Sequence, residues 1–141
     1  MKLELFDTNV LLAVILPHRE QHLAAREAFV ASKTLGQASV CVHTLAEAFS
    51  TLSGKIAIPA KQAVQVLQLN LEDVQILALE QDDYARALER MASLGLSGGG
   101  IFDALLAEVA LRNKCQKLYT FNIKHFIRLG QEIEKITFEP I

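Results

Sequence analysis

The sequence predicts an α/β fold: a three-layer α/β/α sandwich around a central, mostly parallel sheet of about five strands. Short apolar segments alternate along the chain with longer segments of helical periodicity, and this alternation is typical of parallel strands joined by helices. The chain has 141 residues and shows no internal repeat or linker, which is typical of one domain. We therefore expect a single domain over residues 1–141.

The predicted strands are short runs rich in apolar and β-branched residues. They lie at 3–6, 39–42, 74–77, 118–120 and 136–138. The predicted helices have apolar residues at helical spacing and lie at 19–32, 43–53, 60–70, 80–94, 101–113 and 123–129. Pro59 precedes one helix, and Gly95 and Gly130 each follow one, as expected at helix ends.

An apolar run at 10–16 follows Lys2 and superficially resembles a short signal peptide. Asp7 and Asn9 interrupt its approach, and it is much shorter than the ~20 residues of a membrane span. We expect neither export nor membrane insertion.

Composition limits the possible partners. The net charge of −2 argues against binding nucleic acid through overall positive charge, so any polynucleotide contact must be local. Hydrophobic residues make up 51% of the chain without counting glycine, whereas about 45–50% is usual with glycine included. This excess suggests an apolar face that a partner covers. Cys41 and Cys115 show neither CxxC spacing nor a secretory framework, which predicts reduced thiols in a cytoplasmic protein.

Three acids, Asp7, Glu47 and Asp103, stand alone among apolar neighbours. An ionised carboxylate is costly to bury unless something pairs with it, so inward-pointing acids suggest a cation-binding pocket. On a helix, Glu108 and Arg112 would lie roughly 140° and 180° from Asp103. We therefore expect those two residues to mark the solvent face, and Asp103 to face inward.

Each acid also has a simpler interpretation. Asp103 could only favour the positive end of a helix dipole. Glu47, which shares a mildly polar helix side with threonines, could be ordinary surface. Asp7 could cap a helix or turn formed by the run at 10–16, although Asn9 could fill that role instead.

The predicted topology nevertheless gives the acids a common location. Asp7 ends the first strand, Glu47 follows the second by about one helical turn, and Asp103 opens the helix that leads to the fourth. Open α/β sheets bind ligands beyond the carboxyl ends of their strands. A donor set of oxygens alone favours Mg²⁺ or Mn²⁺, and such an ion could activate water for attack on a phosphodiester.

Four segments, in order, resemble the PIN-domain ribonucleases, particularly the VapC-like toxins of toxin–antitoxin pairs. They are FDTNVLL at 6–12, TLAEAFSTL at 44–52, FDALLAEVA at 102–110 and TFNIKHF at 120–126. The resemblance spans nearly the whole chain. It implies a cytoplasmic, Mg²⁺- or Mn²⁺-dependent endoribonuclease for single-stranded RNA, often a homodimer, and held inactive by a cognate antitoxin.

By the same resemblance, Asp7, Glu47 and Asp103 would be metal ligands and catalytic residues. Asn122 is a further candidate, although many relatives have an acid there, and it could simply cap the following helix. Thr8 and Thr120 could orient metal-bound water.

Glycines at 98–100 could let a phosphate approach closely, or could only form a flexible loop. Cations near the predicted site are His18, Arg19, His22, Lys124, His125 and Arg128.

Other protein classes fit less well. A haloacid-type phosphatase needs a second acid where this chain has Asn9, and a receiver-like module needs an acid at the end of the strand at 74–77. The remaining alternative is a catalytically weak or inactive PIN-fold protein that acts as a protein- or RNA-binding module.

Overall fold

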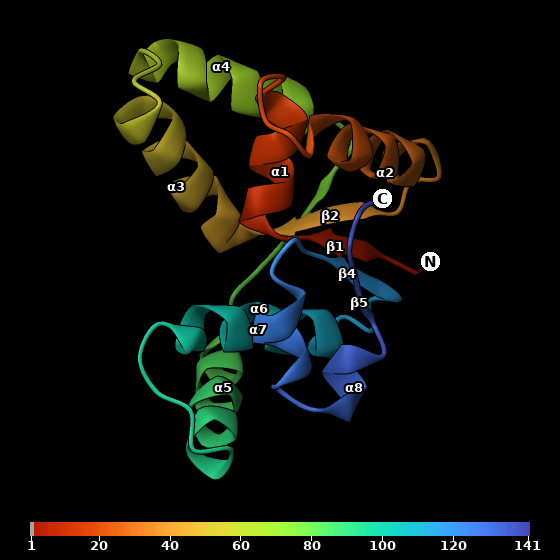
Figure 1. Cartoon of the computed structure of the whole chain (residues 1–141), viewed down its shortest axis with the longest axis vertical. Coiled ribbons are helices and arrows are strands. Elements are labelled where there is room, and N and C mark those ends of the chain that lie inside the picture. Colours follow the sequence, from red (N-terminus) through yellow and green to blue (C-terminus); the bar gives the residue numbers. More distant parts are fainter. Residues whose placement is uncertain (1) are drawn as a thin grey trace.

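The computed structural model describes residues 2–141, and within them five parallel strands form one sheet between two layers of helices (Figure 1). The strands are β1 (Glu4–Phe6), β2 (Ala38–Cys41), β3 (Gln75–Leu77), β4 (Lys117–Tyr119) and β5 (Thr137–Phe138). This architecture confirms the predicted α/β/α sandwich, and the predicted strands lie within one residue of those observed.

The sheet has the strand order β3-β2-β1-β4-β5, so β1 is central. The chain first builds outward from β1 through β2 to β3, and then returns to place β4 on the other side of β1. Leu5 pairs with Ser39 on one side and with Leu118 on the other. The crevice at such a reversal of strand order is where open α/β sheets bind their ligands.

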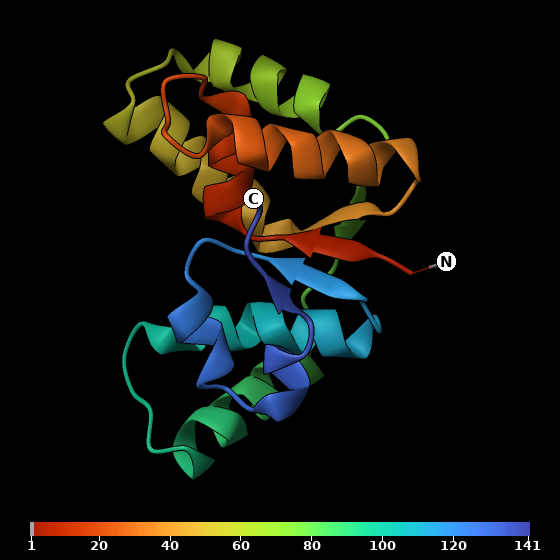
Figure 2. The ribbon, with the colours of Figure 1, turned by 45° about the vertical axis from the view of Figure 1, so that its right-hand side comes forward.

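One face of the sheet is covered by the helices of the first half of the chain (Figure 2). They are α1 (Thr8–Ile15), α2 (His22–Thr34), α3 (Val42–Ser50) with a π-helical turn (Thr51–Lys55), and α4 (Ala60–Asn70). The sequence analysis did not include α1 among its helices. Because α1 is buried on nearly every side, it lacks the polar stripe that marks an amphipathic helix.

The other face is covered by the helices of the second half. They are α5 (Gln81–Ser93), α6 (Gly100–Arg112), α7 (Ile123–Ile127) and α8 (Gln131–Glu134). The observed α7 is therefore shorter than the helix predicted at 123–129, and α8 was not predicted. Gly130 separates the two with a φ of 137°, a value that favours glycine. In the part of the chain described, no helix is long and apolar enough to cross a membrane.

The prediction that Glu108 and Arg112 mark a solvent face of α6 is wrong, because α5 packs over that side. Glu108 is only 3% exposed and pairs with Arg90 on α5 at 3.1 Å. Arg112 donates two hydrogen bonds of 2.9 Å to the fully buried carboxylate of Asp83. Charged residues of α6 therefore hold two helices together.

Candidate functional site

Asp7 lies where β1 ends and α1 begins. Its Oδ1 accepts a hydrogen bond of 2.8 Å from the Thr8 backbone N–H, so Asp7, not Asn9, is the N-cap of α1. Its Oδ2 accepts a hydrogen bond of 2.8 Å from the hydroxyl of Thr120, just beyond β4. The capping interpretation of Asp7 is thus correct. It does not compete with a role in a site, because the carboxylate also lines a pocket.

Glu47 projects from α3 toward the same place. Glu47 is an exposed residue, as its surface interpretation expected, yet it lines the same pocket as Asp7. Its Oε1 accepts a hydrogen bond of 2.7 Å from the Thr8 hydroxyl, which also lies 3.0 Å from the hydroxyl of buried Thr44. Thr8, the residue after Asp7, therefore holds the Glu47 side chain in place. Thr8 and Thr120, considered as water-orienting groups from the sequence, donate hydrogen bonds to carboxylates of the site.

Asp103 reaches the site from the first turn of α6 and is 24% exposed. His125 on α7 places its Nδ1 3.5 Å from Asp103 Oδ2, and the charge of Arg128 also acts on this carboxylate. α7 and the residue that follows it therefore supply a cationic border, from two of the cations considered in the sequence.

Burial has the largest effect on the ionisation of Asp7 and Asp103. Burial raises the pKa of Asp7 to about 6, and repulsion from Asp103 and Glu47 adds to the rise against the opposing bonds from Thr120 and Thr8. Burial also raises the pKa of Asp103, with a contribution from Glu47, although His125 and Arg128 oppose it. The ionisation of Asp7 and of Asp103 is therefore influenced by other carboxylates of the pocket.

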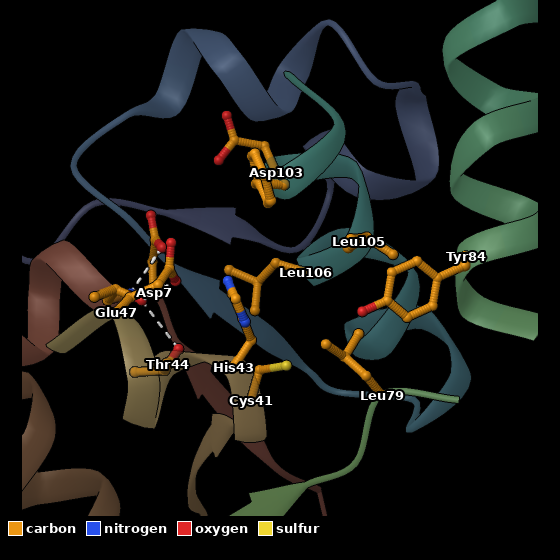
Figure 3. Close-up of a pocket in the computed structure, with 12 residues that line it drawn as sticks. Asp7, Cys41, His43, Thr44, Glu47, Leu79, Tyr84, Asp103, Leu105 and Leu106 are labelled. Carbon is orange, nitrogen blue, oxygen red and sulfur yellow. Dashed lines mark hydrogen bonds between the residues drawn. The ribbon is translucent and has the colours of Figure 1, made fainter. Parts of the chain in front are cut away.

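All three acids line one pocket at the carboxyl ends of the strands (Figure 3). Its other lining residues are Thr8, Cys41, His43, Thr44, Leu79, Tyr84, Phe102, Leu105 and Leu106. The sequence analysis missed the roles of His43, Tyr84 and Phe102. The only available signal was position: His43 lies one turn before Glu47, and Phe102 lies next to Asp103.

Asn122 is not among the residues that line this pocket. Its backbone N–H donates a hydrogen bond of 2.9 Å to the Thr120 hydroxyl. Asn122 occupies the N-cap position of α7, as the capping interpretation expected, but within residues 2–141 its side chain makes no capping bond to that helix. Asn122 positions Thr120, which in turn contacts Asp7.

The glycines at 98–100 have different structural roles. Gly98 has a φ of 70° in the loop before α6. A Cβ on Gly100 would lie 2.8 Å from Arg128 Nη2 and 3.2 Å from Met91 Cε. Gly100 thus lets the start of α6 approach the cation that borders Asp103.

The family model for the PIN domain matches residues 5–131 of this chain. The chain belongs to the PIN domain family. A comparison of the sequence of this PIN protein with curated proteins gives no match.

Three solved structures share the fold of this PIN protein at low sequence identity. VapC20 of Mycobacterium tuberculosis, a sarcin–ricin loop cleaving toxin, is 22% identical with a TM-score of 0.69, over 84% of this chain and 88% of its own. A toxin–antitoxin complex from Klebsiella pneumoniae gives 21% identity and a TM-score of 0.71, over 98% of both chains. DNA-bound VapBC from Salmonella typhimurium gives 19% and 0.74, over 100% of both.

Proposed function

We propose that this PIN protein is a metal-dependent endoribonuclease that cleaves single-stranded RNA and is the toxin of a toxin–antitoxin pair. The observation that carries the proposal is the pocket shared by Asp7, Glu47 and Asp103, where burial and mutual repulsion raise the pKa of Asp7 to about 6. Three acids that repel one another across a pocket favour a cation between them. The structural neighbours include a toxin that cleaves RNA.

The donor set fits a hard divalent cation. Carboxylate oxygens from Asp7, Glu47 and Asp103 would hold Mg²⁺ or Mn²⁺, together with waters, because Mg²⁺ binds few protein ligands and keeps much of its hydration. Within residues 2–141, no group of three or more His, Cys, Asp or Glu side chains stands preassembled for a metal. We therefore infer that the ion and the RNA phosphate complete the site together.

When bound, the ion would supply an activated water and stabilise the charge that develops on the phosphate. The chain's own residues do the rest. Hydrogen bonds from Thr8 and Thr120 hold the carboxylates of Asp7 and Glu47 in place. These two side chains would therefore need little rearrangement to bind the ion. His125 and Arg128 lie beside Asp103 and would hold the phosphate on that side. With water as nucleophile, the products carry 5′-phosphate and 3′-hydroxyl ends.

Asn122 has a secondary role in this proposal. It carries no charge and acts through its backbone bond to Thr120, so a second ion would bind weakly. We expect Asn122→Ala to lower activity far less than Asp103→Asn.

An antitoxin and a second copy of this chain are the proposed partners. Large apolar side chains are exposed on α2 and α4, and these are Leu23, Val30, Val64 and Leu69. A partner protein would cover these exposed apolar side chains, and two of the structural neighbours are named as VapBC or toxin–antitoxin complexes. We place the protein in the cytoplasm, since Cys41 and Cys115 are both unpaired. Light scattering of the purified chain tests for the homodimer.

The decisive experiment uses partner-free protein, single-stranded RNA, and Mg²⁺, Mn²⁺ or EDTA. We expect cleavage that EDTA abolishes and that Asp103→Asn lowers by at least about 100-fold. Asp82→Asn is the matched control, because Asp82 is an exposed acid in the first turn of another helix. Cleavage that survives both EDTA and Asp103→Asn would reject the mechanism. Folded protein that binds RNA without cleaving it would identify a binding module.

A further inference from the structure

The pocket continues beyond the three carboxylates into a second, apolar part. We name it the aromatic lobe, and it is formed by Cys41, His43, Leu79, Tyr84, Phe102 and Leu106. In Figure 3, His43 lies between the Asp7–Glu47 side and the part of the pocket near Cys41, Leu79 and Tyr84.

The aromatic lobe exposes ring surface that the fold itself does not need. Phe102 is 56% exposed and Tyr84 is 46% exposed. The rings of Phe102 and His43 are nearly parallel, with an interplanar angle of 7° and centroids 6.1 Å apart. Exposed aromatic rings beside a cavity are typical of a surface that binds a flat ligand.

The two sides of Asp103 differ in chemistry. On one side lie two basic side chains, His125 and Arg128. On the other lies the aromatic lobe, where Phe102 is the residue next to Asp103 in sequence. A nucleotide has the same two-sided character, with a phosphate that prefers cations and a base that prefers stacking on rings.

We propose that the aromatic lobe receives one nucleobase of the RNA, splayed out of the strand next to the phosphate that is cleaved. The inference rests on the proposed nuclease function and adds the residues that would select the substrate. The exposed ring of Phe102 stacks on the base, and His43 lies beside Phe102. The Tyr84 hydroxyl, which points into the pocket in Figure 3, bonds to the edge of the base, while Leu79 and Leu106 exclude water from it. The rest of the strand needs no base contact.

The test measures RNA affinity in an Asp7→Asn background, which prevents cleavage. Short single-stranded RNAs carry one abasic nucleotide at each position in turn. We expect one position at which base removal weakens binding about tenfold or more, and Phe102→Ala should cause a similar loss with intact RNA. With that abasic RNA, Phe102→Ala should cause no further loss. Phe138→Ala is the matched control, since Phe138 is 41% exposed and lies at the sheet edge on β5.

A second variant keeps the ring but removes the hydroxyl. Tyr84→Phe should alter the relative kcat/KM for RNAs that differ in the base at the sensitive position, and leave the thermal unfolding temperature unchanged. Equal affinity for intact RNA and every abasic RNA, in protein that does cleave RNA, would overturn the aromatic-lobe assignment alone. An equal loss from Phe138→Ala would also overturn it. Failure to cleave or bind any RNA would instead overturn the proposed function, and this inference with it.

Discussion

Thr120 donates a hydrogen bond of 2.8 Å to Asp7 Oδ2, and so joins two residues that are 113 positions apart in the sequence. Both side chains are buried at the carboxyl ends of neighbouring strands, with Asp7 after β1 and Thr120 after β4. This contact fixes the most buried carboxylate of the site.

Removing the Thr120 hydroxyl should change the ionisation of Asp7. Thr120→Val keeps the shape of the side chain but removes a bond that lowers the pKa of Asp7, so that pKa should rise further. The acidic limb of the RNA-cleavage profile should move to higher pH, and unfolding should become easier by about 1–3 kcal/mol. A pH–rate profile measures the first effect. Thr34→Val is the control, because the Thr34 hydroxyl bonds only within α2, and an equal shift there would contradict the prediction.

The stability of the metal-free protein should fall between about pH 4 and pH 6. The pKa of Asp7 is raised from 3.8 to about 6 in the folded state, so in this window the folded state binds more protons than the unfolded state. The Asp7 contribution is therefore complete at low pH and is lost as the pH rises, by up to about 3 kcal/mol. Denaturant unfolding at each pH measures it. The loss should be smaller in Asp7→Asn, where the raised pKa of Asp103 still contributes, and a loss of the same size there would assign it to another group.

Divalent metal should stabilise the folded protein. A ligand that binds only the folded state adds about 2.7 kcal/mol at a concentration of 100 times its Kd, and Mg²⁺ also relieves the repulsion among Asp7, Glu47 and Asp103. We expect Mn²⁺ and Mg²⁺ to raise the melting temperature of the wild type, and to raise it much less in Asp103→Asn. Asp82→Asn should respond like the wild type. A metal response that is identical in all three proteins would place the ion elsewhere.

The ion pair between α5 and α6 should control stability without taking part in cleavage. Asp83 is fully buried and receives two bonds from Arg112 and one from Arg86. Arg112→Met leaves this carboxylate with less compensation, and the free energy of unfolding should fall by about 3–5 kcal/mol. Asp83→Asn combined with Arg112→Met should recover part of the loss. RNA cleavage by the folded variant should keep its wild-type kcat at low temperature, and a large fall in kcat would contradict this.

The sequence predicted the five strands well, because each is a short apolar run bounded by polar residues. The sequence-based predictions were wrong for segments that other helices cover. The helix α1 has no polar stripe, and Glu108 and Arg112 resemble solvent-facing charges until α5 is placed against them. In the site, the position of Asp7 after a strand and of Asp103 at the start of a helix predicted the pocket that both line, whereas the solvent-face argument for Asp103 was wrong. The bonds from Thr8 and Thr120, and the stacking of His43 on Phe102, join residues distant in sequence, which periodicity cannot detect.

The residues of the candidate site come from two separate parts of the chain, because the chain returns to the side of β1 only after β3 has formed. Asp7 and Glu47 come from the first 50 residues, whereas Asp103 and Thr120 come from the last 40. During translation, the growing polypeptide therefore has no complete centre until β4 has left the ribosome and joined the sheet. If the protein cleaves RNA as proposed, a nascent chain therefore stays inactive until its β4 segment has been made and has joined the sheet.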